Sequence, residues 1–83
     1  MSEISVTILY FAKLKESRGV AEETLQVASG THAHALYERL KEQHGLGLSI
    51  THVQVAIDEA FASWDAVLED GQTVAFIPPV SGG

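Results

Sequence analysis

The chain has 83 residues, of which 46% are hydrophobic and 19% are charged, so we expect one domain, residues 1–83, that folds by itself. Eleven acidic residues against five basic ones give a formal charge of −6, which opposes binding to the phosphate backbone of nucleic acids. The chain has no cysteine, which excludes a disulfide framework and a side-chain thiol as a reactive group. We expect neither a membrane segment nor a secretory signal, and the cytoplasm as the compartment.

Residues 4–11 alternate in polarity as a strand does. The side chains on one face of this predicted strand are apolar throughout: Ile4, Val6, Ile8 and Tyr10. The opposite face begins polar and becomes apolar at Leu9 and Phe11. An ordinary half-buried strand does not do this, so both faces near the end of the strand are expected to contact protein.

A helix is predicted after a short hairpin. Residues 13–22 are rich in charge and predict a connection, and residues 24–27 alternate again as the second strand. Thr31 is the predicted N-cap, because its hydroxyl can accept a hydrogen bond from a free amide of the first turn. The apolar face of the helix is formed by Ala33, Leu36, Tyr37 and Leu40. Gly45, whose backbone adopts the left-handed conformation at low cost, is its predicted end.

The second half of the chain predicts further strands. Residues 52–57 form one, with Val53, Val55 and Ile57 turned inward and His52, Gln54 and Ala56 turned outward. Residues 61–68 are compatible with either a short strand or a single helical turn. A turn at Asp70 and Gly71 precedes the last predicted strand, residues 72–77.

This order of elements predicts an α+β fold of the β-grasp type, with a mixed sheet of 4–5 strands and one main helix packed across one face. Fold-level analogy places the first and last strands side by side and parallel in the middle of the sheet. Residues 79–83 are predicted to form an extended, flexible C-terminal Gly-Gly tail.

The tail carries the most specific information in the sequence. Pro78 and Pro79 end the last strand, because neither can donate a ladder hydrogen bond. Gly82 and Gly83 lack a Cβ, so this end is thin enough to enter a narrow channel. The residues expected to thread into a partner are Pro79, Val80, Ser81 and Gly82. A Gly-Gly ending alone is also compatible with a frayed terminus, but the strand and the two prolines before it favour delivery of the Gly83 carboxylate into another protein.

The segment VAFIPPVSGG, together with the upstream LEDGQT turn and the opening ILYFAKLKE, resembles the small, sulfur carrier subunit of molybdopterin synthase, the MoaD family, which is ubiquitin-like. The resemblance covers essentially the whole chain. It departs from the family at position 77, where Ile stands in place of a frequent Phe, and residues 44–52 match no signature of the family. Neither departure affects the tail.

The resemblance implies a carrier whose working group is Gly83. A ubiquitin-activating-like adenylyltransferase would use ATP to join AMP to this carboxylate, and a sulfur donor protein would displace AMP to leave a thiocarboxylate. The large subunit, with which the family forms a heterotetramer, would receive the tail, and sulfur would pass to cyclic pyranopterin monophosphate to form the molybdopterin dithiolene. The chain would then be a non-catalytic co-substrate without a bound cofactor. The alternatives are a carrier for thiazole or tRNA thiolation and a ubiquitin-like protein modifier.

A partner-binding surface is predicted beside the tail. If the first and last strands are parallel neighbours, Phe11 and Ile77 lie together on the outer face of the sheet. The resemblance adds Phe61 on that face and Lys15 as a basic position near the partner. The alternative is that the three apolar residues belong to the core. No metal site is expected, because the four histidines do not share one face of a predicted element.

Overall fold

The computed structural model describes residues 2–79. Two α-helices, one 3-10 helix and five strands follow one another in this part of the chain. In order they are β1 (Glu3–Tyr10), α1 (Ala12–Arg18), β2 (Glu22–Ala28), α2 (Ala33–His44), η1 (Ile50–His52), β3 (Gln54–Ile57), β4 (Ala60–Ala62) and β5 (Thr73–Ile77). None of these helices is long and apolar enough to span a membrane.

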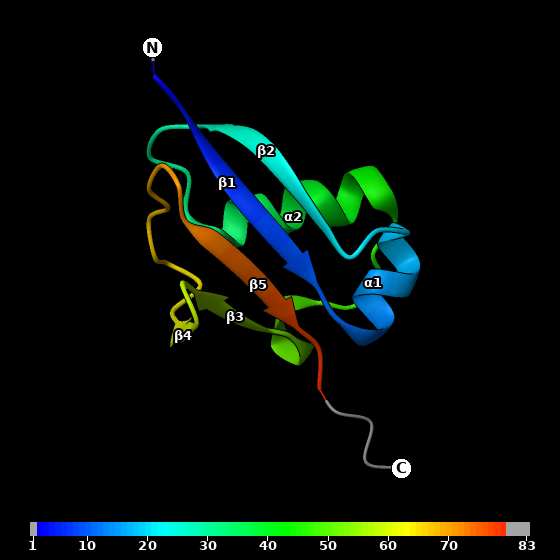
Figure 1. Cartoon of the computed structure of the whole chain (residues 1–83). Helices are drawn as coiled ribbons and strands as arrows, with labels where there is room; N and C mark the ends of the chain where they lie inside the picture. Colours follow the sequence, from blue (N-terminus) through cyan, green and yellow to red (C-terminus); the bar gives the residue numbers. More distant parts are fainter. Residues whose placement is uncertain (1, 80–83) are drawn as a thin grey trace.

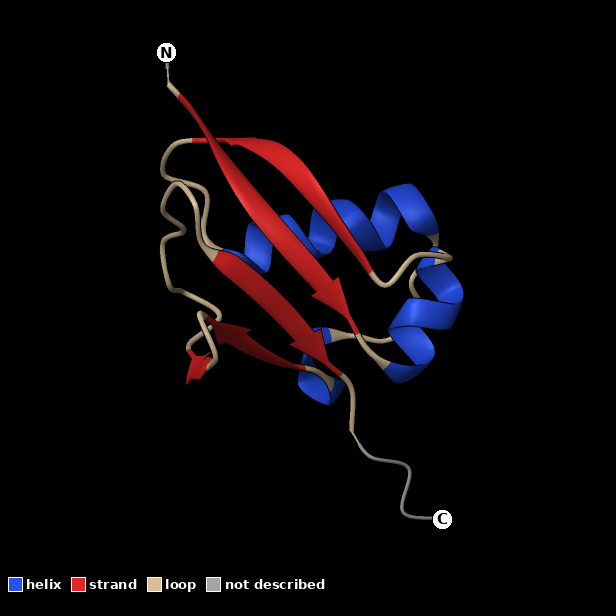
Figure 2. Ribbon diagram, in the orientation of Figure 1, coloured by secondary structure: helices blue, strands red, loops and turns tan. Residues whose placement is uncertain are grey.

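The strands form one mixed sheet in the order β2-β1-β5-β3-β4. β1 and β5 are parallel, with Tyr10 opposite Phe76, and the other neighbouring strands are antiparallel. Figures 1 and 2 show α2 crossing one face of the sheet, while the opposite face carries no helix. The predicted α+β architecture and the adjacent, parallel first and last strands are therefore confirmed.

The core lies between the sheet and α2. Its largest fully buried side chains are Tyr10, Tyr37, Phe76, Ile8, Leu14, Leu36 and Leu40. Trp64 stacks on Phe76 at a ring distance of 5.9 Å and an interplanar angle of 9°. Burying each large apolar side chain contributes about 1.5–3 kcal/mol before the entropy of ordering is counted. The predicted inward faces of the first strand and of the main helix are both confirmed by this core.

The region predicted as a connection, residues 13–22, contains the helix α1. Only Leu14 of this helix is buried, at 1% exposure, and its remaining residues contact solvent to some degree. A helix of 7 residues with one inward side chain shows no three-and-four repeat, so periodicity misses it. Gly19, in the left-handed conformation at φ 87°, ends it, and its amide donates to the Lys15 carbonyl at 2.9 Å.

The start of α2 was predicted one residue early. His32, not Thr31, is the N-cap, and its Nδ1 accepts a hydrogen bond from the Ala35 amide at 3.3 Å. The Thr31 backbone is occupied elsewhere, since its carbonyl accepts from the Leu68 amide at 2.9 Å. Gly45 ends the helix as predicted, at φ 65°.

The third strand is shorter than predicted. It begins at Gln54, because Ile50–His52 form a 3-10 turn. Val53 and Val55 are buried as predicted. Ala56 lies on the face of the sheet opposite α2, as predicted, but its small side chain is buried there between Ala75 of β5 and Phe61 of β4. Of the two options for residues 61–68, the structure has the short strand, which begins at Ala60.

Candidate docking surface and tail root

The uncovered face of the sheet carries an apolar surface that extends over β1, β5, β3 and β4. We call it the outer-face patch, and its residues are Leu9, Phe11, Ala56, Phe61, Ala75 and Ile77, which line one shallow depression. Phe61 exposes 72% of its surface and Phe11 exposes 45%. Aromatic side chains exposed together on one face of a protein are typical of an interaction site.

Strand geometry places Phe11 on this face. Tyr10 is the last residue of β1 and points into the core, and Phe11 keeps an extended backbone at φ −126° and ψ 152°. The alternation therefore continues for one residue and turns Phe11 outward. Because Tyr10 is paired with Phe76, the next residue of β5, Ile77, faces the same side.

The structure thus brings together three of the sequence-predicted residues: Phe11, Phe61 and Ile77. The exposure of the two phenylalanines excludes the alternative that they are core residues. That the three residues bind a partner stays a prediction.

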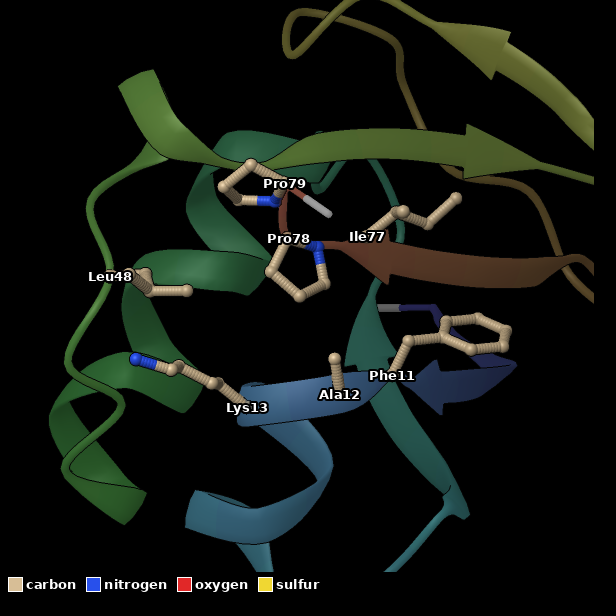
Figure 3. Close-up of a pocket in the computed structure, with 7 residues that line it drawn as sticks. All are labelled: Phe11, Ala12, Lys13, Leu48, Ile77, Pro78 and Pro79. Carbon is tan, nitrogen blue, oxygen red and sulfur yellow. The ribbon is translucent and has the colours of Figure 1, made fainter. Parts of the chain in front are cut away.

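The chain leaves the sheet beside this patch. β5 ends at Ile77, after which Pro78 is buried and Pro79 is exposed. A groove of about 460 Å³ lies at this point (Figure 3), and we call it the tail-root groove. It is lined by Phe11, Ala12, Lys13, Leu48, Ile77, Pro78 and Pro79. The other predicted tail residues, Val80, Ser81, Gly82 and Gly83, lie outside the described residues.

Sequence reasoning missed Lys13 and Leu48. Lys15, the predicted basic residue, instead lines a separate depression with Val20 at the far side of α1. Residues two apart on a helix are about 200° apart around its axis, so Lys13 and Lys15 leave α1 on different sides, and the role of Lys15 stays a prediction. A helix prediction over residues 12–18 would have separated the two lysines, whereas no sequence signal marks Leu48.

An ion pair fixes the helix that borders the tail-root groove. Arg18 near the end of α1 donates to both carboxylate oxygens of Glu23 on β2, at 2.8 and 2.9 Å. These bonds hold the pKa of Glu23 below its ordinary value, against the opposing effect of burial. The Tyr10 hydroxyl also donates to Glu23, and burial followed by this bond raises the tyrosine pKa. These contacts tie α1 and the end of β1 to β2. Phe11 and Lys13 lie in the segment between the tied residues Tyr10 and Arg18.

The surroundings of the tail root differ in charge from the rest of the molecule. A second depression on the other side of Pro78 and Pro79 is lined by His52 and Gln54, among others. None of the described residues that line this depression or the tail-root groove is acidic, although the whole chain carries −6. The lack of acidic residues and the adjacent apolar patch suit this region to docking of a protein surface next to Pro79.

The parallel β1–β5 pair and the single main helix across the mixed sheet define a ubiquitin-like β-grasp protein. The model of the ThiS family matches residues 8–83. The chain belongs to the ThiS family.

Two relatives, both named molybdopterin synthase sulfur carrier subunit, match along nearly their whole length. The protein of Chlamydomonas reinhardtii is 34% identical over 83 residues, which cover 96% of this chain and 100% of the relative. That of Mycobacterium tuberculosis is 35% identical over 82 residues, which cover 96% of this chain and 99% of the relative. The resemblance that the sequence showed is confirmed.

Solved structures share the fold. A putative molybdopterin converting factor, subunit 1, from Pyrococcus furiosus has a TM-score of 0.79 and 30% identity, covering 93% of this chain and 99% of that chain. A complex of subunits 1 and 2 of the molybdopterin-converting factor from Helicobacter pylori has a TM-score of 0.64 and 23% identity, covering 96% of this chain and 100% of that chain. The second similarity concerns the fold alone.

Proposed function

We propose that the chain is the sulfur carrier subunit of a molybdopterin synthase and that its working group is the carboxylate of Gly83. The observation that carries this proposal is the position of the outer-face patch, which lies at the edge of the sheet where β5 ends. A protein that docks on the patch meets the chain beyond Pro79 at the same place. The names of the ThiS-family relatives support the same function.

The proposed chemistry needs an activated carboxyl group. A carboxylate is a poor acyl donor, whereas its mixed anhydride with AMP has a good leaving group. An adenylyltransferase would form this anhydride from ATP and release pyrophosphate. Sulfide supplied by a sulfur donor would then attack the carbonyl carbon, the bond to AMP would break, and AMP and a proton would leave the thiocarboxylate behind. Its sulfur is ionised and nucleophilic at neutral pH, which suits a carrier that has no cysteine.

The partners in this proposal follow from its steps. They are the large subunit of molybdopterin synthase, a ubiquitin-activating-like adenylyltransferase and a sulfur donor protein. The complex of subunits 1 and 2 from Helicobacter pylori supports the first of them. Two carriers and two large subunits would form a heterotetramer in the cytoplasm, and sulfur would pass to cyclic pyranopterin monophosphate. The carrier itself binds no cofactor in this scheme, and ATP is used by the activating partner.

Intact mass spectrometry tests the loading step. The chain is incubated with the adenylyltransferase, ATP and a sulfur donor, and we expect a gain of about 16 Da, the replacement of one oxygen by sulfur. A chain that lacks Gly83 is the control and gains nothing. Linkage of the chain to lysines of other proteins, without this gain, would instead identify a protein modifier.

A transfer assay separates the sulfur pathways. The thiocarboxylated chain is mixed with the large subunit of molybdopterin synthase and cyclic pyranopterin monophosphate, and dithiolene formation is measured. We expect product together with the return of the chain to its unmodified mass. A loaded chain that forms no product here, but supports thiazole synthesis or tRNA thiolation, would contradict the proposed pathway.

A further inference from the structure

We propose that the tail-root groove is a second docking site, and that it receives an apolar side chain of the large subunit next to a carboxylate of that subunit, which pairs with Lys13. The inference rests on the proposed function, because it takes the large subunit as the protein that receives the tail. It adds a site and a chemistry of recognition to the outer-face patch.

The walls of the groove select an apolar occupant. Leu48, Pro78 and Ile77 contribute hydrocarbon surface, and among the described residues that line the groove Lys13 alone is charged. Figure 3 shows the Lys13 side chain extended toward the side of the groove on which Leu48 lies. A lysine stem covers apolar surface while its ammonium group stays in water, so the groove is apolar inside and cationic at its rim.

The groove is continuous with the outer-face patch. Phe11 and Ile77 line both surfaces, and Pro78 and Pro79 form the part of the groove from which the chain continues. A protein that covers the patch and also encloses the residues after Pro79 must pass over the groove. If water stayed in the groove, the apolar walls of the groove would remain exposed to it. A partner side chain that displaces this water buries the walls and strengthens binding.

The positive charge of Lys13 predicts the second group of the partner, a carboxylate. Lys13 forms no ion pair with any residue between positions 2 and 79. The described residues around Pro78 and Pro79 include no carboxylate, although acidic residues outnumber basic ones by 11 to 5 in the chain. A carboxylate on the partner therefore finds an ammonium group here without an ion-pair partner among residues 2–79 and no carboxylate among the residues that line the groove, which favours an acidic residue at this one point of the partner surface.

Calorimetric binding to the purified large subunit tests the electrostatic part. Lys13→Glu is expected to weaken binding about tenfold or more at low salt, and the loss is expected to shrink as salt screens the charges. Arg39→Glu, the same charge reversal at an exposed site on α2, is the matched control and should change the affinity less than about twofold. Equal effects of both variants would show a general influence of net charge and overturn the proposal, as would tighter binding by Lys13→Glu.

The apolar part has its own test. Leu48→Gln replaces the branched hydrocarbon of the wall by a side chain that ends in a polar amide, so binding should weaken about fivefold or more with little dependence on salt. Thermal unfolding of the free variant shows whether it is folded at the temperature of the measurement. Leu48 also packs against the core. If Leu48→Gln unfolds, the binding of Lys13→Glu, a variant at an exposed site, decides whether the groove is a docking site.

The outcomes distinguish this proposal from the function on which it rests. If Phe61→Ala weakens binding while Lys13→Glu and Leu48→Gln leave it unchanged, the groove is not a docking site and the proposed function stands. If the unaltered chain does not bind the large subunit, both proposals fail. Restoration of the Lys13→Glu affinity by changing one carboxylate of the large subunit to lysine would identify the expected pair.

Discussion

Phe61 lies on a strand of 3 residues at the edge of the sheet and exposes 72% of its surface. Such exposure leaves most of a large aromatic ring in water, which folding alone does not favour. Its neighbours on the outer face, Phe11 and Ile77, make it part of one surface. The residue is therefore best explained by what it contacts in a complex.

A binding measurement on Phe61→Ala tests that explanation. We expect affinity for the large subunit to fall by about 1–3 kcal/mol, within the range of hot-spot residues, while the free energy of unfolding changes by less than about 0.5 kcal/mol. Val67→Ala is the control, because Val67 exposes 57% of its surface but does not line the patch. Loss of stability in Phe61→Ala with unchanged binding would assign the ring to folding.

The Arg18–Glu23 ion pair makes stability depend on pH. Since the pKa of Glu23 is held below its ordinary value of 4.5, the contribution is complete above this value and is lost as the pH falls through the lower, folded-state pKa. Glu23→Gln should cost about 1 kcal/mol at pH 7. Urea unfolding should show this difference from the unaltered chain shrinking below pH 4.5. A difference that stays constant down to pH 2.5, or about that value, would show that the charge has no part in it.

At the residue scale, the sequence predicts which side chains face outward better than which ones share a surface. Alternation alone placed Phe11 and Ile77 on the outer face, and the structure has them there. Lys15 was predicted from a family position, and it lines another depression than Lys13 does, so its part in partner binding stays a prediction. Leu48 joins the tail-root groove only through tertiary contact, which no local pattern encodes.

At the scale of the elements, the joint between β1 and α1, at Ala12, positions the end of the patch at Phe11. Ala12, the first residue of the helix, has φ 50°, a left-handed backbone that is costly for side chains other than glycine. This conformation turns the chain sharply after Phe11 and places Lys13 beside Pro78 and Pro79.

Substitution at this joint should reveal its strain. Ala12→Val places a β-branched side chain at a positive φ and should destabilise the protein by about 1–2 kcal/mol, as measured by urea unfolding. Ala12→Gly is the matched change without a side chain, and it should leave the stability within about 1 kcal/mol of the unaltered chain. If valine is tolerated as well as glycine, the joint does not depend on this backbone conformation.

The strands and the main helix were predictable because their inward faces repeat along the sequence with the periods of a strand and a helix. α1 was not predictable, since it buries a single residue, Leu14, and its other residues are charged or small. The N-cap of α2 was misassigned because the Thr31 carbonyl accepts a hydrogen bond from the Leu68 amide, 37 positions away. This bond forms only when residues 31–68 are folded, so no local pattern reveals it. Local patterns thus predict elements, and contacts between distant residues decide their ends.

At the scale of the whole molecule, the proposed docking of a partner and the proposed transfer of sulfur use different parts of the chain. The patch and the tail-root groove belong to the folded β-grasp body, whereas the proposed chemistry takes place on Gly83, beyond Pro79. Changes to the body should therefore alter affinity, and changes to the tail should alter transfer.

A chain extended by one tryptophan after Gly83 tests this separation. It should bind the large subunit with an affinity within about threefold of the unaltered chain, because the docking surfaces are unchanged. Thiocarboxylate formation, followed by intact mass, and dithiolene formation should both be lost, provided that mass spectrometry shows the added residue to be retained. Normal cofactor formation by the untrimmed chain would contradict the role of the terminal carboxylate.

The position of β5 also affects how the protein is made. This strand is inserted between β1 and β3, so a nascent chain on the ribosome cannot close its sheet until β5 has left the exit tunnel. Truncated products of interrupted translation would lack a central strand and expose their interior to proteases. The segment that leads into the tail is thus also required for a folded product, and a cell would accumulate few folded carriers without it.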